Sequence, residues 1–319
     1  MGGRTLADEG EFGLISAITA GLTMPDAVTV GPGDDCAVFA PRGQVVVSTD
    51  AMYEEVHFRK AWSGPRDVGR KAIASALADV EAMGATPLGV VVALSAPPET
   101  PTDWALDFTK GVREECERGG AVLMGGDVTR GQAIGIVVTA FGDLEGRAPL
   151  LRSGARAGDV VAYVGRLGMA AAGLAVLARG FRSPGAVVRA HRVPEVAYGQ
   201  GRVAAEAGAS ALIDCSDGLL ADLGHVARAS GMAIDLNSAS LDVDEAQKTV
   251  AAAIGGGDPL NYILTGGDDH ALLGTFAEGD VPDGWTVIGH VRAPEPDAVA
   301  SVTVDGVAWS DGAGGWRHF

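Results

Sequence analysis

Aspartates beside small residues recur in five short segments that lie far apart in the chain. The segments are Val-Gly-Pro-Gly-Asp-Asp (30–35), Ser-Thr-Asp (48–50), Ala-Leu-Ala-Asp (76–79), Gly-Gly-Asp (125–127) and Asp-Cys-Ser-Asp-Gly (214–218). Carboxylates among glycines suit a hard divalent cation, and Mg²⁺ binds such oxygens while it shares its coordination shell with substrate phosphates. The pattern therefore indicates a magnesium-dependent enzyme of nucleotide chemistry.

Most of these segments also have a simpler interpretation as local structure. Gly, Pro and Asp are ordinary turn residues, which accounts for 30–35, and 48–50 reads equally as a cap or turn. Ser216 or Asp217 is a candidate N-cap for a following helix. Asp79 is harder to explain, because a carboxylate near the C-terminus of a helix opposes the macrodipole. A surface aspartate remains the alternative at that position.

The elements expected in the first half of the chain alternate between strands and helices. Segments 36–40 and 44–48 are predicted to form a hairpin around the turn Pro41-Arg42-Gly43. Apolar residues at helical spacing predict an amphipathic helix over 66–83. Lys71, Ser75 and Asp79 lie four residues apart, so they share one ridge of that helix. Further strands are expected over 88–94, 121–124 and 134–141, and a helix over 102–118 capped by Thr102.

Residues 142–158 are rich in Gly, Arg, Pro and Asp and lack periodicity, which marks a boundary between two domains. We expect an N-terminal domain over 1–147 and a C-terminal α/β domain over 148–319. In the second domain the pattern predicts strands at 160–164, 211–213, 234–236, 272–276, 286–288 and 302–304, and helices over 169–179 and after 217. Asp214 then follows directly on a buried strand, where a capping role does not explain it.

Composition limits the possible partners of the protein. The formal net charge is −17, which disfavours binding to nucleic acid or to an anionic membrane surface. Three cysteines without a Cys-x-x-Cys pair predict neither a disulfide framework nor a thiolate zinc site. Cys215 lies between two aspartates, so we expect a raised thiol pKa and a role as a small buried residue.

The sequence lacks the common nucleotide-binding motifs, a signal segment and a stretch long enough to span a membrane. There is no P-loop motif and no dinucleotide fingerprint after a strand, so metal ions rather than a P-loop lysine must offset the charge of a nucleotide. The N-terminus has no apolar signal core, and the apolar stretches are shorter than the roughly 20 residues that span a bilayer. We therefore expect a soluble, cytoplasmic protein.

Taken together and in order, these segments resemble the thiamine-monophosphate kinases, a family within the aminoimidazole ribonucleotide synthetase superfamily. The resemblance covers almost the whole chain, from Gly10-Glu11-Phe12-Gly13-Leu14-Ile15 to the aromatic tail Trp316-Arg317-His318-Phe319. Its longest stretch is KAIASALADVEAMGATP (71–87), and others are GDDCAV (33–38), RSGARAGD (152–159), DCSDGLLADLGHVARAS (214–230) and LTGGDD (264–269).

The resemblance implies a two-domain α/β (α+β) fold, with a mixed sheet and helices in an N-terminal domain that binds ATP and Mg²⁺. It also implies a C-terminal α/β domain that completes the active site, and a homodimer joined through the N-terminal sheets. The implied reaction moves the γ-phosphoryl group of ATP, a co-substrate, directly to thiamine monophosphate with several Mg²⁺ ions bound. Because the acceptor phosphate is already a nucleophile, no strong general base is required.

The family's functional residues map onto this sequence position by position. The implied metal ligands are Asp35, Ser48, Thr49, Asp50, Asp79, Asp127, Asp214 and Asp217, and five of these (Asp35, Asp50, Asp79, Asp127 and Asp214) are the implied catalytic residues. The implied nucleotide contacts are Gly126, Asp127, Arg152 and Ser216, and the implied substrate contacts are His57, Asp268 and Trp316. Trp316 would stack on the cationic thiamine rings; by its residue type alone, a terminal aromatic docked on the core is the alternative.

One segment departs from the family pattern. The family usually shows Gly-Gly-Glu-Asp-Tyr-Glu-Leu where this chain has Gly266-Gly267-Asp268-Asp269-His270-Ala271-Leu272. Two other functions follow from the same residues. One is an ATP-dependent synthetase of this superfamily with a different small-molecule acceptor, against which the aromatic tail and His57 argue. The other is a protein that binds nucleotide or metal without turnover, which the altered segment suggests.

Overall fold

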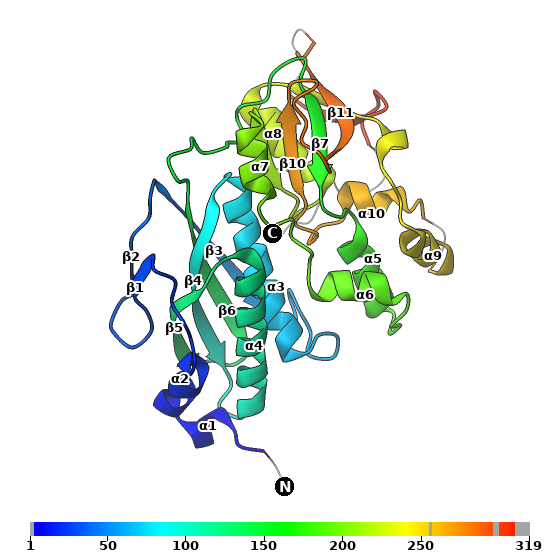
Figure 1. Cartoon of the computed structure of the whole chain (residues 1–319). Helices are drawn as coiled ribbons and strands as arrows, with labels where there is room; N and C mark the ends of the chain where they lie inside the picture. Colours follow the sequence, from blue (N-terminus) through cyan, green and yellow to red (C-terminus); the bar gives the residue numbers. More distant parts are fainter. Residues whose placement is uncertain (1–2, 255–256, 296–299, 310–319) are drawn as a thin grey trace. The chain divides into compact units, whose positions relative to one another are not determined.

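The computed structural model describes residues 3–254, 257–295 and 300–309 and divides the chain into two compact units (Figure 1). The first unit comprises Met1–Val80 and Thr86–Gly146, and the second comprises Glu81–Ala85 and Arg147–Phe319. Along 3–146 the elements are α1 (Leu6–Glu9), α2 (Glu11–Thr19), β1 (Val28–Val30), β2 (Val38–Phe39), β3 (Val45–Tyr53), α3 (Pro65–Ala82), β4 (Thr86–Ala96), α4 (Thr102–Gly119), β5 (Leu123–Arg130) and β6 (Gly135–Asp143).

A four-stranded mixed sheet in the order β3-β6-β4-β5 forms the centre of the first unit. The β4–β5 pair is parallel and the other two pairs are antiparallel, which agrees with the mixed sheet expected from the sequence. Helices α3 and α4 run along this sheet in Figure 1. The two helices come into close contact at Gly69 and Gly111, because a Cβ at either position would lie about 2 Å from the other helix's backbone.

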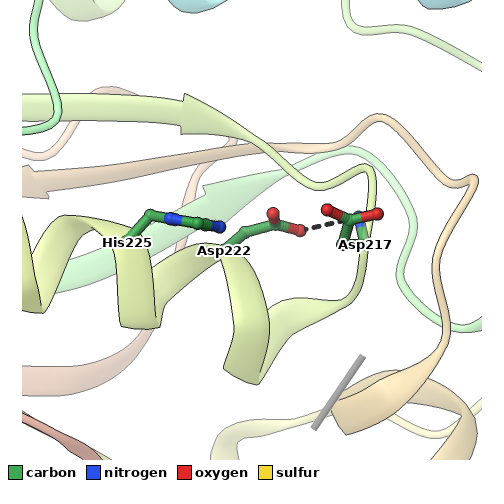
Figure 2. Close-up of side chains that lie close together, drawn as sticks. All are labelled: Asp217, Asp222 and His225. Carbon is green, nitrogen blue, oxygen red and sulfur yellow. Dashed lines mark hydrogen bonds between the residues drawn. The ribbon is translucent and has the colours of Figure 1, made fainter. Parts of the chain in front are cut away.

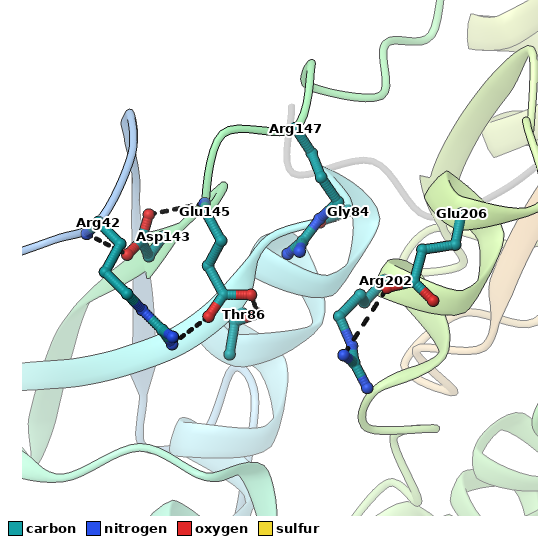
Figure 3. A network of polar contacts seen from close by, with 8 residues as sticks. All are labelled: Arg42, Gly84, Thr86, Asp143, Glu145, Arg147, Arg202 and Glu206. Atoms are coloured by element: carbon teal, nitrogen blue, oxygen red, sulfur yellow. Dashed lines mark hydrogen bonds and ion pairs between the residues drawn. The ribbon is translucent and has the colours of Figure 1, made fainter.

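The predicted hairpin between 36–40 and 44–48 is wrong. Strand β2 pairs with β1, and β3 pairs with β6 over its whole length, from Val45 opposite Asp143 to Tyr53 opposite Gly135. Instead of closing a hairpin, the Pro41-Arg42-Gly43 segment contacts the end of β6, as Figure 3 shows for Arg42 and Asp143. The Asp143 carboxylate accepts the backbone N–H groups of Arg42 at 2.6 Å and of Glu145 at 2.8 Å. The hydrogen-bond acceptor for the Arg42 N–H thus comes from a residue 101 positions later in the chain.

The predicted C-terminal ends of two strands, β3 and β5, are also wrong, and candidate metal ligands lie at both of them. Ser48-Thr49-Asp50 lies in the middle of β3 rather than at its end, and Gly125-Gly126-Asp127 lies inside β5 rather than in a turn after it. The prediction stopped each strand where the apolar residues stop. The ladders to β6 and β4 continue past those points, because backbone pairing does not require apolar side chains. Helix α4 likewise begins at Thr102, with Pro101 at the N-cap position.

The second unit contains a six-stranded sheet in the order β12-β9-β11-β7-β10-β8, in which only the β12–β9 pair is parallel among the described strands. Its elements are β7 (Val160–Val164), α5 (Met169–Ala178), α6 (Gly185–Arg192), α7 (Gln200–Glu206), β8 (Ala211–Asp214), α8 (Leu219–Ser230), β9 (Ala233–Leu236), η1 (Ser238–Ser240), α9 (Glu245–Ala253), α10 (Leu260–Thr265), β10 (Leu272–Phe276), β11 (Thr286–Arg292) and β12 (Val302–Val304). The strands predicted at 160–164, 272–276 and 302–304 are confirmed to the residue.

Apolar side chains on the two faces of this sheet pack into separate clusters. Val161, Ile213 and Leu273 contribute to one cluster with residues of α8, while Val160, Leu212 and Leu272 contribute to the other. Alternate residues of a strand point to opposite faces, so these strands are buried on both sides. This doubly buried sheet holds the end of β8 and the start of β10, where the acidic loops described below are attached. None of the helices in the described ranges combines the length and the hydropathy of a membrane span.

Candidate active site

In the first unit, strand β3 brings two of the expected metal ligands to α3. The Ser48 hydroxyl donates a hydrogen bond to the Asp79 carboxylate at 2.5 Å. Asp50 lies two residues further along β3, so strand alternation places it on the same face as Ser48. Thr49 points to the other face, where its hydroxyl lies 3.1 Å from that of Thr139. The structure therefore groups Ser48, Asp50 and Asp79 on one face and separates Thr49 from them.

Asp127 lies on β5, the strand at the opposite edge of the same sheet. Two strands separate it from Asp50, which corresponds to about 14 Å between the two backbones at the usual strand spacing. A single Mg²⁺ holds its ligand oxygens at about 2.1 Å, so these two carboxylates serve different ions if both bind magnesium in this arrangement. Gly126 is required by close packing, because a Cβ there would lie 2.1 Å from the Val92 carbonyl oxygen.

The acidic pair after β1 is exposed, and one of its members stabilises its own turn. The Asp34 carboxylate accepts the backbone N–H of Asp35 at 2.9 Å. Asp34 therefore acts as an ordinary turn residue, as the simpler interpretation of this segment expected. Asp35 is exposed. His57 follows β3, and its Nδ1 accepts the backbone N–H of Tyr53 at 3.0 Å.

In the second unit, Asp214 closes β8 and is almost fully buried, with 3% of its surface exposed. Its Oδ2 lies 3.0 Å from Nδ1 of His270, a residue that the sequence did not single out as functional. An ionised carboxylate can only accept, so the shared proton belongs to the imidazole Nδ1. Sequence spacing gave no signal for this contact, because the two residues are 56 positions apart.

The loop between β8 and α8 is organised by Asp222, which sequence reasoning also missed. Its Oδ2 accepts the backbone N–H groups of Asp217 and Gly218, both at 3.0 Å. Gly218 occupies the N-cap position, so the expected cap by Ser216 or Asp217 is wrong. Desolvation, together with the nearby charge of Asp214, raises the pKa of Asp222 to about 7.

Asp217, Asp222 and His225 form the one group of three potential metal-ligand side chains found in the described part of the chain (Figure 2). Their ligand atoms lie within 4.8 Å of one another. The Asp217 carboxylate suits Mg²⁺, whereas an imidazole is a poor ligand for that ion. One oxygen of Asp222 already binds the loop backbone, and His225 lies 3.2 Å from the Arg228 guanidinium. Asp217 therefore fits magnesium better than its two neighbours do.

A second loop, between α10 and β10, lies against the first. The backbone N–H of Asp268 donates to the Ser216 carbonyl at 2.8 Å, and that of His270 donates to the Cys215 carbonyl at 2.9 Å. Gly267 is required here, since a Cβ would lie 2.4 Å from the Ser216 carbonyl oxygen. Asp268 and His270 both have positive φ, +71° and +56°, conformations that the two paired backbones hold in place. Cys215 is fully buried, and desolvation raises its thiol pKa, as expected from the sequence.

Asp269 lies between Asp268 and His270 and attaches the α10–β10 loop to the start of α5. Its carboxylate accepts the backbone N–H groups of Gly168 and Ala170, the latter at 2.9 Å. Burial raises the pKa of Asp269 to about 7, although these hydrogen bonds oppose the shift. The family resemblance drew attention to Asp268, whereas the structure assigns the anchoring role to its neighbour.

This pKa predicts that stability depends on pH in a defined direction. An unfolded aspartate titrates near pH 3.9, so between about pH 4 and 7 the native state binds a proton that the unfolded state lacks. We expect the free energy of unfolding to fall as pH rises, by roughly 2 kcal/mol from pH 5 to 7 for this one group. Urea unfolding of wild type and Asp269→Asn at both pH values measures it. An identical fall in the two proteins would contradict the prediction.

The remaining expected site residues are less informative. Arg152 lies in an exposed loop, where its carbonyl accepts the Ser230 hydroxyl at 3.0 Å, and Ser216 contributes its carbonyl to the contact with Asp268. Trp316 lies outside the described residues.

Comparison with known proteins gives matches along the whole chain. Residues 33–144 match the family model of the AIR synthase related protein, N-terminal domain. A curated relative from Mycobacterium tuberculosis, named thiamine-monophosphate kinase, is 49% identical over 99% of this chain and 93% of its own. A relative of the same name from Corynebacterium glutamicum is 40% identical over 99% of this chain and 96% of its own.

Solved structures support the same relationship. The structure of AaThiL complexed with AMPPCP and TMP has a TM-score of 0.80 and 31% identity, over 99% of both chains. Thiamine-monophosphate kinase from Stenotrophomonas maltophilia has a TM-score of 0.78 and 33% identity, over 92% of this chain and 95% of its own. The hydrogenase maturation protein HypE, at 18% identity and a TM-score of 0.69, shares the fold. The expected two-domain α/β fold of this superfamily is confirmed.

Proposed function

The chain belongs to the thiamine-monophosphate kinase family, and on that basis we propose that it transfers the γ-phosphoryl group of ATP to thiamine monophosphate, giving thiamine diphosphate and ADP. The full-length match to relatives that carry this name is the observation on which the proposal rests. A related structure with an ATP analogue and TMP supports both substrates. The cytoplasmic location stays a prediction.

We propose that the acidic residues of each unit bind Mg²⁺. In the first unit the candidate ligands are Asp35, Ser48, Asp50, Asp79 and Asp127, with Thr49 on the opposite sheet face from Asp50; in the second they are Asp214 and Asp217. When bound, magnesium would offset the negative charge of donor and acceptor phosphates. Asp50, Asp127 and Asp214 lie on strands and Asp79 lies on α3, so regular backbone would hold their carboxylate oxygens in place. Such placement matters because a small displacement of these groups slows phosphoryl transfer.

The substrate contacts remain proposals carried by the family resemblance. We propose that Gly126, Asp127, Arg152 and Ser216 contact the nucleotide, and that His57, Asp268 and Trp316 contact thiamine monophosphate. Asp268 has the strongest support, because its half-buried carboxylate lies beside two imidazoles, those of His191 and His270. An anionic group at this position attracts the cationic thiazolium ring.

One assay tests the reaction. With ATP, Mg²⁺ and thiamine monophosphate, we expect thiamine diphosphate to form in equal amount to ADP. Excess EDTA should abolish the rate and added Mg²⁺ should restore it, because the carboxylates alone only add negative charge to that of two phosphates. ADP formation without thiamine diphosphate would indicate another acceptor. Full activity with EDTA would exclude the proposed role of the aspartates.

We also propose a homodimer joined through the sheet of the first unit. Strand β3 exposes apolar side chains on the face opposite Ser48 and Asp50, with Val47 at 60% and Tyr53 at 49% exposed. An apolar strand face left open to water is typical of a protein–protein contact.

Val47→Glu is expected to convert the dimer into a monomer, because it would bury a charge in the proposed contact. Light scattering after size-exclusion chromatography measures the mass. Val287→Glu is the matched control, since Val287 on β11 is exposed to 40% but belongs to the sheet of the second unit. A wild type that is monomeric at assay concentration, or a Val47→Glu variant that stays dimeric, would refute the proposal.

A further inference from the structure

Two carboxylates and two imidazoles alternate in a row within the second unit. Nδ1 of His270 lies 3.0 Å from Oδ2 of Asp214, and Nε2 of His270 lies 3.9 Å from Oδ1 of Asp268. Nδ1 of His191, on α6, lies 4.0 Å from Oδ2 of Asp268. His270 therefore lies between a candidate metal ligand and a candidate substrate contact, on both of which the proposed reaction depends.

The position of the His270 ring is fixed by its surroundings. His270 is 7% exposed, and its backbone N–H donates a hydrogen bond to the Cys215 carbonyl. The neighbouring Asp269 attaches the same loop to α5. The ring contact with Asp214 has the length of a hydrogen bond, whereas the ring contact with Asp268 is an ion-pair distance. Of these two, only the interaction with Asp214 is directional.

Within the described ranges, the Asp214 carboxylate has one hydrogen-bond partner, the His270 imidazole. Among the described residues, its Oδ1 accepts no hydrogen bond, while Oδ2 is occupied by the imidazole. A carboxylate with one oxygen held by an N–H donor keeps its orientation and retains the other oxygen for a cation. Partners of this kind tune metal ligands in many proteins, and their loss commonly costs about 10- to 100-fold in metal affinity or activity.

We propose that His270 is a positioning residue of the phosphoryl transfer. By donating Nδ1–H to Oδ2 of Asp214, it holds that carboxylate ready for a divalent cation and sets its position relative to Asp268. The inference rests on the proposed function for its kinetic consequence. Its structural part, the orientation of Asp214 by an imidazole donor, is independent of which acceptor is phosphorylated.

Three substitutions separate the effect of the hydrogen-bond donor from the effect of the ring's size. His270→Asn keeps an N–H donor near the position of Nδ1, and asparagine tolerates the positive φ of 56° at this position. His270→Leu has a similar size and no donor. His270→Ala removes the donor with less bulk, so a leucine variant that fails to fold does not decide the matter.

Mn²⁺ is the probe, and the additional loss of its free-ion EPR signal when protein is added to a fixed mixture of Mn²⁺ and a non-hydrolysable ATP analogue measures binding without turnover. We expect the leucine and alanine variants to bind Mn²⁺ at least about tenfold more weakly and to lose kcat at saturating Mg²⁺ by a similar factor. The asparagine variant should stay within about threefold of wild type in both measurements, because its donor remains.

Two results would overturn the proposal. One is wild-type Mn²⁺ affinity and kcat in both variants that lack the donor. The other is equal impairment of the asparagine and leucine variants, which would show that the donor is not the property that matters. If wild type itself forms no thiamine diphosphate, the proposed function fails alone, and the Mn²⁺ titration still decides whether His270 positions Asp214.

Discussion

Asp79→Asn is expected to lower kcat/KM by about a hundredfold or more while the protein stays folded. Asp79 accepts the Ser48 hydroxyl across the β3–α3 contact, and Asp50 shares this face of the sheet. An asparagine oxygen still accepts the Ser48 hydrogen bond, so the packing of α3 survives. What is lost is the negative charge that a magnesium ion requires.

Steady-state assays across a range of Mg²⁺ concentrations measure the effect, and urea unfolding checks the fold. Asp107→Asn is the matched control, because Asp107 lies on α4 in the same unit with an exposed side chain paired to Lys110. It should retain activity within about twofold, as is usual for surface changes of this kind. Ser48→Ala should have an intermediate effect, since it removes a neutral candidate ligand that also donates a hydrogen bond to Asp79, while the carboxylate charge remains. Wild-type turnover by Asp79→Asn would remove this residue from the site.

Asp214→Asn is the second large expected loss, again about a hundredfold or more in kcat/KM. The asparagine oxygen can still accept Nδ1–H of His270, so the buried imidazole keeps its partner. The negative charge disappears, however, from the end of β8. Because the Asp214 charge contributes to the raised pKa of Asp222, the substitution should also lower that pKa.

Activity assays and NMR titration of the Asp222 carboxyl measure the two effects separately. Asp280→Asn, at an exposed position of the second unit, is the control that should change neither. An inactive variant with an unchanged Asp222 pKa would contradict the electrostatic link between the two residues. An active variant would contradict the assignment of Asp214 as a ligand.

Local patterns predicted those elements whose boundaries coincide with a change in composition. The helix expected over 66–83 is α3 (Pro65–Ala82), and the strand expected over 272–276 is β10. The patterns failed where a ladder continues through polar residues, at Ser48-Thr49-Asp50 and at Gly125-Gly126-Asp127. Strand length there depends on the partner strand, and no local signal in the sequence records the partner.

The candidate site divides in the same way. Residue type and order indicated Asp79, Asp214 and Asp217, because carboxylates beside small residues at element ends are visible without a structure. They did not indicate Asp222 or His270. The first binds the loop backbone four and five residues earlier in the chain, and the second reaches its carboxylate across 56 positions.

The sequence by itself indicated the chemistry proposed for this protein: carboxylates that suit a hard cation, no P-loop lysine, and a family resemblance that covers almost the whole chain. Only the tertiary structure decided which way the candidate ligand side chains point and which residues contact them. Strand alternation turned Thr49 away from Asp50, and the pairing of two distant loops placed His270 against Asp214. The physical reason is that ligand preference follows from the side chain, whereas orientation follows from backbone hydrogen bonds that distant segments supply.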